Sequence, residues 1–234
     1  MKRILIPTLG LSDWRRLLAD PDTQWERKAS AFELAVSWES ADHSERGLPK
    51  EIAEALDQEL SLAGARALIA LPEHKVTLRG RGKPSQSDVW ALLLSGSGYV
   101  SMAVEGKAGE PFASTLADWL EEASEGKKER LKFLCDTLQV SDQPPSSLRY
   151  QLFHRTASAV LEAQRFRAPL AVMMVQSFKT DEQSWRDYGA FANLLGATPT
   201  RGRVAEALRR GSERLFLGWV DCAPAPDSLV ADAV

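Results

Sequence analysis

The stretch from residue 88 to residue 107 reads DVWALLLSGSGYVSMAVEGK and has the pattern of a β-hairpin. Two apolar runs, 88–94 and 99–107, flank the turn SGSG at 95–98. When the turn is centred between Gly96 and Ser97, counting outward along both strands pairs Asp88 with Glu105. The sequence therefore predicts two carboxylates opposite each other at the open end of the hairpin.

Asp88, Glu105 and Lys107 are expected on one face of this hairpin. The two paired side chains would have Cβ atoms ~5 Å apart, and Lys107, two residues beyond Glu105, would point the same way. Facing carboxylates repel and need a cation between them. Lys107 would supply part of that charge, and Mg²⁺ or Mn²⁺ would supply more.

This arrangement suits metal-assisted phosphodiester hydrolysis. A lysine beside the ion would orient or deprotonate the attacking water, or stabilise charge on the phosphate. The simpler alternative is a turn residue at a strand start and an exposed charged rim. However, the flanking strand residues are apolar, so these charges end an otherwise buried ladder and require partners.

The rest of the chain predicts a mixed α/β sheet with helices on its faces. SDWRRLLAD is expected to be a short helix with Ser12 as its N-cap. The helix at 147–166 is expected to be a crossover from the hairpin to a buried strand at 168–178. Other helices are expected at 22–40, 49–62, 114–123, 127–139, 182–195 and 201–211. Extended segments are expected at 66–78 (broken by Pro72) and 214–220, with loops at 79–87 and 141–147.

The composition is that of a folded globular protein: 234 residues, 44% hydrophobic and 26% charged. We expect one domain over residues 1–221 and a flexible tail over 222–234. No apolar run of ~18 residues and no secretory leader is present, so we expect a cytoplasmic protein without a membrane partner. The net charge of −3 means that a nucleic-acid site would need a local basic patch. Cys135 and Cys222 lack metal-ligand spacing and are expected to be buried.

The spacing of Asp88, sixteen residues and then Glu105-Gly106-Lys107 resembles the PD-(D/E)XK nuclease superfamily. The motif reads SQSD…VEGK, with Ser87 where the family name has Pro. The expected element order also resembles that superfamily's restriction-endonuclease-like αβββαβ core. The segments PSQSD, AVEGKAGEPF, LRYQLFHRT and LGWV are similar to an uncharacterised bacterial family thought to have this fold.

The resemblance implies roles for individual residues. Asp88 and Glu105 would be metal ligands, the Gly106 carbonyl would join the metal shell, and Lys107 would be the catalytic lysine. Glu33 would match the acidic residue that some members place on the first helix, facing the metal. Its alternative is a solvent-exposed Glu between apolar neighbours.

Gln151 and Arg155 lie four apart and share one face of the 147–166 helix. Some DNA-end-processing members of the superfamily carry Gln and Tyr at this spacing. Here Arg155 takes the second position and Tyr150 precedes the Gln, which departs from that subgroup. Arg155 could still hold a phosphate, and the alternative is an ordinary polar helix face.

The loop before Asp88 is basic. Residues 75–87 contain no acidic side chain, and Arg79, Arg81 and Lys83 could form a phosphate-binding lip. Glycines at 80 and 82 would let the backbone approach phosphates. The alternative is a flexible basic loop without a ligand.

The sequence thus predicts a Mg²⁺- or Mn²⁺-dependent nuclease-like hydrolase, with DNA favoured over RNA by the resemblance. Two alternatives remain open. One is a non-catalytic nucleic-acid or protein binding module on the same fold. The other is a hydrolase of a different phosphate-containing molecule.

Overall fold

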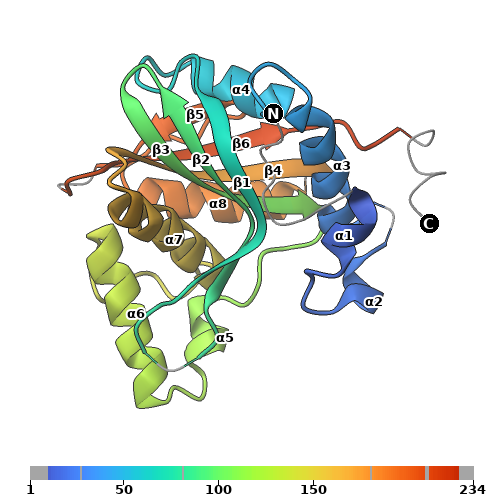
Figure 1. Ribbon diagram of the computed structural model, residues 1–234. Helices are drawn as coiled ribbons and strands as arrows, with labels where there is room; N and C mark the ends of the chain where they lie inside the picture. Colours follow the sequence, from blue (N-terminus) through green and yellow to red (C-terminus); the bar gives the residue numbers. More distant parts are fainter. Residues whose placement is uncertain (1–9, 27, 81, 180, 209–210, 227–234) are drawn as a thin grey trace.

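A mixed β-sheet forms the centre of the computed structural model, which describes residues 10–26, 28–80, 82–179, 181–208 and 211–226 (Figure 1). Within these residues the sheet has six strands in the order β1-β2-β3-β4-β6-β5. Its strands are β1 (Arg66–Val76), β2 (Ser85–Ser95), β3 (Gly98–Ala108), β4 (Leu170–Lys179), β5 (Arg203–Glu206) and β6 (Arg214–Asp221). The predicted α/β class, a mixed sheet flanked by helices, is confirmed.

The β2–β3 hairpin has the register that the sequence predicts. The strands are antiparallel, with Ser95 opposite Gly98 at the turn and Val89 opposite Val104 near the open end. Asp88 and Glu105 each lie one residue beyond the last of these pairs. The turn is short enough for its residues to determine the pairing along the whole hairpin.

A crossover helix, α7 (Tyr150–Phe166), connects β3 to β4. β4 is parallel to both β3 and β6, and its residues from Leu170 to Phe178 are all buried. A strand that is covered on both faces is expected to be apolar throughout, as this one nearly is. The predicted crossover is therefore confirmed.

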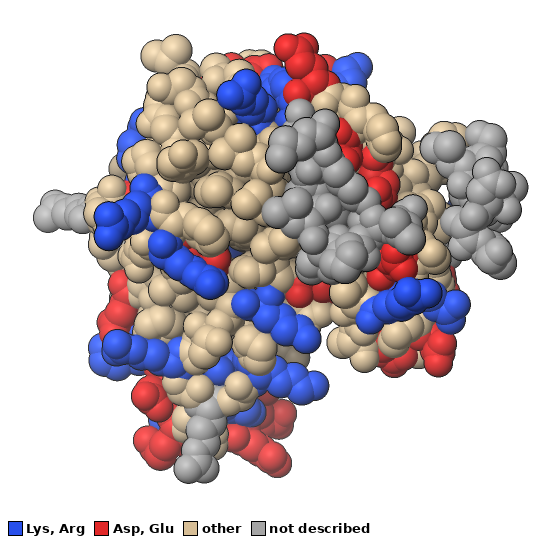
Figure 2. Space-filling model, viewed as in Figure 1, with Lys and Arg blue, Asp and Glu red and all other residues tan. Residues whose placement is uncertain are grey.

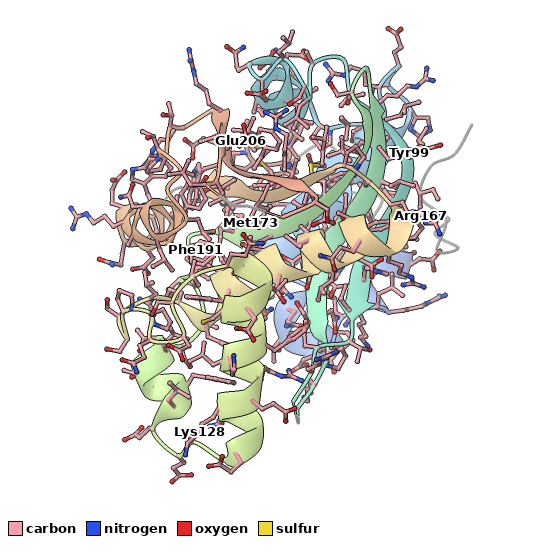
Figure 3. All side chains as sticks on the ribbon, turned by 90° about the vertical axis from the view of Figure 1, so that its left-hand side faces the viewer. Tyr99, Lys128, Arg167, Met173, Phe191 and Glu206 are labelled. Carbon is pink, nitrogen blue, oxygen red and sulfur yellow. The ribbon has the colours of Figure 1, made fainter. Side chains whose placement is uncertain are left out.

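Helices cover both faces of the sheet. One face packs against α7 and against α5 (Leu116–Leu120), α6 (Glu125–Leu138) and α8 (Glu182–Leu194). Met173 and Phe191 are fully buried in this layer, between the sheet and the helices (Figure 3). The other face packs against α1 (Leu11–Arg15), α3 (Ser30–Asp42) and α4 (Lys50–Asp57).

The prediction of one helix over 22–40 is wrong. Two helices occupy this region, α2 (Pro21–Gln24) and α3, and the described residues between them, 25–26 and 28–29, are not helical. Trp25 leaves the helical region at φ −97° and ψ 68°, and Lys28 has φ 69°. The Trp25 ring instead packs edge-on against Phe32, with ring centroids 5.4 Å apart.

The prediction of a helix over 201–211 is also wrong for the described residues, and residues 209 and 210 lie outside them. Residues Arg203–Glu206 form the edge strand β5, which pairs with β6. The Glu206 carboxylate accepts two 2.7 Å hydrogen bonds from Arg214 of β6. Pairing with a neighbouring strand outweighs the weak local preference for helix.

Smaller differences concern element ends. α1 begins at Leu11 with Gly10 as its N-cap, so Ser12 lies inside the helix. β2 begins at Ser85, within the predicted loop. Pro72 lies within β1, which is tolerated because β1 is an edge strand. In the predicted tail, Cys222 N–H donates to the Ser177 carbonyl at 2.7 Å, and residues 227–234 lie outside the described part.

Gly106 lets α3 approach β3 closely. A Cβ atom added at Gly106 would overlap the Leu34 side chain, lying 2.9 Å from its Cγ. We expect Gly106→Ala to destabilise the protein by about 1–3 kcal/mol, because a packed core tolerates added volume poorly. Urea unfolding measures this, with Gly96→Ala as the control, because a Cβ there meets nothing within 4 Å. Equal stability of the two variants would contradict the expectation.

Candidate functional site

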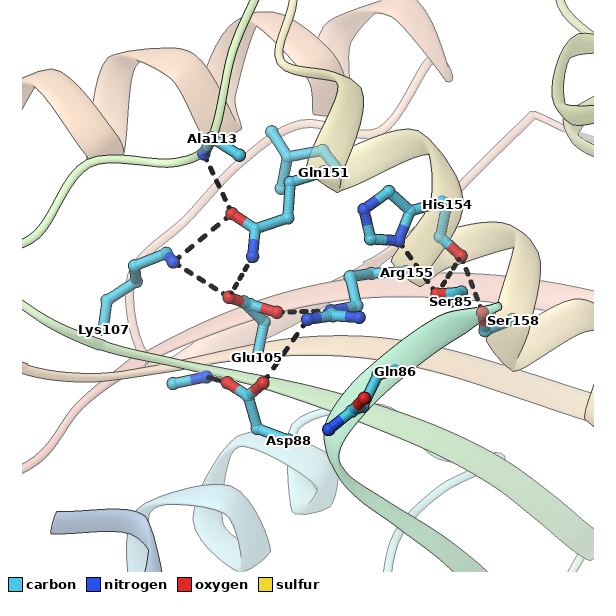
Figure 4. Close-up of polar contacts among 12 residues, drawn as sticks. Ser85, Gln86, Asp88, Glu105, Lys107, Ala113, Gln151, His154, Arg155 and Ser158 are labelled. Atoms are coloured by element: carbon cyan, nitrogen blue, oxygen red, sulfur yellow. Dashed lines mark hydrogen bonds and ion pairs between the residues drawn. The ribbon is translucent and has the colours of Figure 1, made fainter. Parts of the chain in front are cut away.

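Asp88 and Glu105 meet at the open end of the hairpin, as predicted (Figure 4). The Asp88 Oδ2 atom accepts a 2.8 Å hydrogen bond from the Gly106 backbone N–H. The Glu105 Oε1 atom accepts hydrogen bonds from Lys107 Nζ at 2.8 Å and from Gln151 Nε2 at 2.6 Å. The side chain of Glu105 is only 3% exposed, so these donors replace water around its charge.

Arg155 lies between the two carboxylates. Its Nε donates to Glu105 Oε2 at 2.5 Å, and its Nη2 lies 3.4 Å from Asp88 Oδ1. The predicted need for a cation between the carboxylates is met here by a guanidinium. Lys107 pairs with Glu105 and packs over the Phe112 ring, 4.9 Å from its centroid.

Gln151 connects the hairpin to the chain that follows it. Its Oε1 atom accepts from the Ala113 N–H at 3.1 Å and lies 3.4 Å from Lys107 Nζ. Gln151 and Arg155 are one helical turn apart on α7, so both reach the carboxylates from the same side. The structure thus brings five of the predicted residues together: Asp88, Glu105, Lys107, Gln151 and Arg155.

Glu73 of β1 is a site residue that the sequence analysis missed. Its neighbours Pro72 and His74 pair with Val89 and Ser87, so Glu73 lies opposite Asp88. Its Oε2 atom accepts a 2.5 Å hydrogen bond from Gln86 Nε2. A single acidic residue in the apolar segment LIALPEHKV is the one sequence signal for it. The β1–β2 connection is too long to predict the register.

The three carboxylates have different proton affinities. Burial, and then the charge of Glu105, raise the pKa of Asp88 to about 7. Burial and the charge of Asp88 raise the pKa of Glu73 to about 8. Burial opposes ionisation of Glu105, but Arg155 and Lys107 outweigh it and lower its pKa to about 2. Glu105 is therefore the firmly ionised member.

A pocket of about 530 Å³ opens beside these residues. Its walls are the site side chains, Glu110 and residues between the end of α1 and the first turn of α3, namely Leu18, Ala19, Gln24, Ala29, Ser30 and Ala31. The site therefore has room for a small anionic group next to Lys107 and Arg155. We call this space the carboxylate pocket.

The donor atoms suit a hard divalent cation. Glu73, Asp88 and Glu105 supply carboxylate oxygens, which such ions prefer, and only Lys107 and Arg155 oppose their charge. With Glu110 also in the wall, four acidic groups against two cations leave an excess of negative charge when all are ionised. In the described part of the chain, however, no three His, Cys, Asp or Glu residues are grouped closely enough to hold a metal.

The prediction that Glu33 faces the metal is wrong, and so is its alternative of a solvent-exposed Glu. Glu33 is buried, and its Oε2 atom accepts a 2.6 Å hydrogen bond from Ala225 N–H. It lines a different cavity, next to Phe178 and Cys222. The physical reason is that α3 covers the opposite face of the sheet, and only its first residues reach the carboxylate pocket.

One family model matches the chain, over residues 7–224, and is described as Domain of unknown function (DUF6946). The chain belongs to this family. The DUF6946 match includes every site residue described above, and the family description assigns no activity. Searches of curated proteins and of solved structures each found no match. Among the residues that the structure describes, no helix is long and apolar enough to cross a membrane.

The basic loop packs on α6. Gly80, at φ +83°, approaches Arg130 so closely that an added Cβ would lie 2.9 Å from the Arg130 Cβ. The Arg79 guanidinium lies over the Phe133 ring of α6, 5.7 Å from its centroid. Lys83 is exposed, and Arg81 lies outside the described residues. The glycines of this loop therefore serve close packing against α6.

His154 of α7 is held neutral beside the site. Burial, and then the charge of Arg155, lower the pKa of His154 to about 3, and its Nδ1 lies 2.8 Å from Ser85 Oγ. Between pH 6.5 and 3 the unfolded chain binds a proton here that the folded chain does not. The contribution of His154 to the free energy of unfolding is therefore fully present above about pH 6.5. Below that pH it decreases by at most about 1.4 kcal/mol per pH unit.

We therefore expect His154→Asn to lose less stability than the wild type on acidification. Urea unfolding of both proteins at neutral pH and near pH 5 measures the difference, which isolates His154 from the other titrating groups. Parallel loss of stability in the two proteins would contradict a neutral buried His154.

Proposed function

We propose that this protein is a metal-dependent phosphodiester hydrolase that acts on nucleic acid, with DNA as the favoured substrate. One observation carries the proposal: Asp88, Glu105 and Lys107 converge with Gln151 and Arg155 at the wall of an open pocket. Carboxylates, a lysine and an arginine in one pocket provide both metal ligands and phosphate-binding cations.

The resemblance to the PD-(D/E)XK superfamily supports this proposal. That resemblance implies a helix, three strands, a crossover helix and a fourth strand. The elements α3, β1, β2, β3, α7 and β4 follow this order, with α4 inserted before β1, α5 and α6 inserted before α7, and β4 parallel to β3. As part of the same proposal, we place the protein in the cytoplasm.

Asp88, Glu105 and the Gly106 carbonyl would hold Mg²⁺ or Mn²⁺, with Glu73 as an additional carboxylate nearby. The ion would polarise a phosphoryl oxygen and lower the pKa of bound water. Lys107 places a positive charge beside Glu105, where it orients water or stabilises charge on the phosphate. Gln151 positions Lys107 and Glu105 by contacting both. Arg155 exchanges its carboxylate partners for phosphate oxygens.

A non-catalytic binding module is the second candidate. The observation that favours it is the set of hydrogen bonds around Glu105, whose two oxygens already accept from Lys107, Gln151 and Arg155. Such a network is complete without a metal. In that case Arg155 and Lys107 would bind phosphate without turnover.

A cleavage panel separates the two candidates. Plasmid, linear duplex, single-stranded DNA and RNA are incubated with the wild type and Asp88→Asn, in Mg²⁺, Mn²⁺ or EDTA. We expect cleavage that requires metal and is lost in the variant. Nucleic-acid binding by the wild type without cleavage of any substrate would reject the hydrolase in favour of the binding module.

A further inference from the structure

Another cavity lies at the start of β2, where Ser85 forms part of its wall. It has a volume of about 320 Å³, and we call it the basic cavity. Its wall contains three cationic side chains and no carboxylate. The lining residues are Leu78, Gly82, Lys83, Pro84, Ser85, Trp119, Lys127, Arg130, Tyr150 and His154. An anion would meet attraction here without a competing acidic group.

Arg130 is the most informative residue of the basic cavity. It is 95% buried (5% exposed), and it donates to the backbone carbonyls of Lys83 at 2.6 Å and Gly80 at 3.2 Å. Its buried Nε atom has no hydrogen-bond partner, and Arg130 forms no ion pair with a carboxylate of the described residues. A buried charge without a counter-ion is costly, and an anion in the basic cavity would lie beside the Arg130 guanidinium and offset that cost.

Aromatic rings form one wall of the basic cavity. The Trp119 and Tyr150 rings stack with centroids 4.0 Å apart and 9° between their planes, and Tyr150 lies 4.9 Å from the His154 ring. Lys127 Nζ donates to the Trp119 carbonyl at 2.8 Å and lies 5.7 Å from the Trp119 ring. Cations beside aromatic rings suit a phosphate that carries a sugar and a base.

A further cavity of about 470 Å³ adjoins both sites, because it shares lining residues with each, and we call it the intervening cavity. It shares Lys83 and His154 with the basic cavity, and Gln86 and Arg155 with the carboxylate pocket. Lys75 also lines it. In Figure 2 a band of Lys and Arg side chains crosses this part of the molecule, from the lower ends of β1 and β2 to α6. The basic cavity and the intervening cavity, neither of which has a carboxylate in its wall, thus form a cationic approach to the edge of the carboxylate pocket.

The same two elements carry both sites. Ser85 and Asp88 of β2 are three residues apart, which is ~10 Å along a strand. On α7, Tyr150 and His154 line the basic cavity, and the residues directly after each line the carboxylate pocket. This separation is greater than the ~3.4 Å by which one stacked nucleotide advances along the helix axis, so phosphates at the two sites would belong to different nucleotides of one strand.

We propose that the basic cavity binds a phosphate group of a nucleic-acid strand whose scissile phosphodiester lies in the carboxylate pocket. This inference rests on the proposed function, because it extends the substrate from one phosphodiester to a strand of several nucleotides. Arg130, Lys83 and Lys127 bind the distal phosphate. The aromatic wall contacts the attached nucleotide.

Two double variants with the same change in net charge test this inference. Lys83→Gln/Lys127→Gln removes charge from the basic cavity. Lys128→Gln/Lys132→Gln removes it from the exposed side of α6, where both lysines pair with acidic neighbours and Lys128 projects at the end of the helix (Figure 3). Binding of fluorescent thymidine oligonucleotides is followed by anisotropy in EDTA, which excludes turnover.

For an oligonucleotide of about eight residues, we expect the cavity variant to bind about 10-fold more weakly than the control variant. In a plot of the logarithm of the binding constant against the logarithm of the salt concentration, the slope for the cavity variant should be less steep by ~0.7 for each phosphate contact removed. A dinucleotide has a single internucleotide phosphate and cannot occupy both sites, so it should bind the wild type more weakly than the longer oligonucleotide does. Equal binding of the longer oligonucleotide by both variants overturns the inference.

The source of the phosphate is tested separately with inorganic pyrophosphate. If the basic cavity binds only free phosphate, pyrophosphate should raise the melting temperature of the control variant more than that of the cavity variant. The two variants should then bind the oligonucleotide equally well. That result overturns the inference.

The cleavage panel tests the proposed hydrolase activity independently of this inference. Weakened oligonucleotide binding by the cavity variant, without cleavage of any substrate, would support the strand-binding site and reject the proposed activity. Cleavage by the wild type, with equal oligonucleotide binding by both variants, would support the activity and reject the strand-binding site.

Discussion

Replacing Lys107 with methionine is expected to lower metal-dependent cleavage by about 10²–10³-fold, the usual effect of removing one charged or hydrogen-bonding group that stabilises a transition state. Lys107 Nζ is bound to Glu105 and faces the pocket, and methionine keeps the contact with Phe112 while removing the charge. Single-turnover rates at saturating enzyme measure the chemical step directly.

The matched control for this prediction is Lys132→Met. Lys132 is exposed on α6, pairs with Asp136 and contributes nothing to the carboxylate pocket. Its cleavage rate should equal that of the wild type. A Lys107→Met protein that cleaves at the wild-type rate would remove Lys107 from the mechanism.

Arg155→Met is expected to destabilise the protein by about 3–5 kcal/mol, the cost of removing one partner from a buried ion pair. The Arg155 side chain is 9% exposed and contacts both Asp88 and Glu105, so its loss leaves two facing carboxylates without their shared cation. Urea unfolding in EDTA measures the loss. Arg15→Met, which breaks the exposed pair with Asp22, is the control and should change little.

Mg²⁺ should recover part of this stability. A divalent cation bound by the carboxylates would replace the charge of Arg155, and binding to the folded state stabilises it by mass action. We therefore expect millimolar Mg²⁺ to raise the melting temperature of Arg155→Met more than that of Arg15→Met. The same increase in both variants would argue against a metal at the carboxylates, whatever the outcome for activity.

The hairpin and the crossover were predictable because local rules determine them. A short turn determines the pairing of β2 and β3, and the direction of the crossover follows from the position of α7 between two parallel strands. Together they bring Asp88, Glu105 and Lys107 next to Gln151 and Arg155. The predicted part of the site therefore depends on short-range spacing and one chain connection.

The missed parts depend on contacts between distant segments. Glu73 enters the site through the pairing of β1 with β2, and β5 exists because β6 offers it a partner. Glu33 leaves the site because α3 packs on the other sheet face and meets Ala225. None of these contacts has a signature in the spacing of neighbouring residues.

The contact between Gly106 and Leu34 has a consequence for how the family varies. Gly106 lies between Glu105 and Lys107, and the Leu34 side chain fills the space that a side chain at 106 would take. The side chains at positions 106 and 34 therefore compete for the same space between β3 and α3. Among DUF6946 sequences, a larger residue at the position of Gly106 should therefore occur with a smaller one at the position of Leu34, so the two columns should change together.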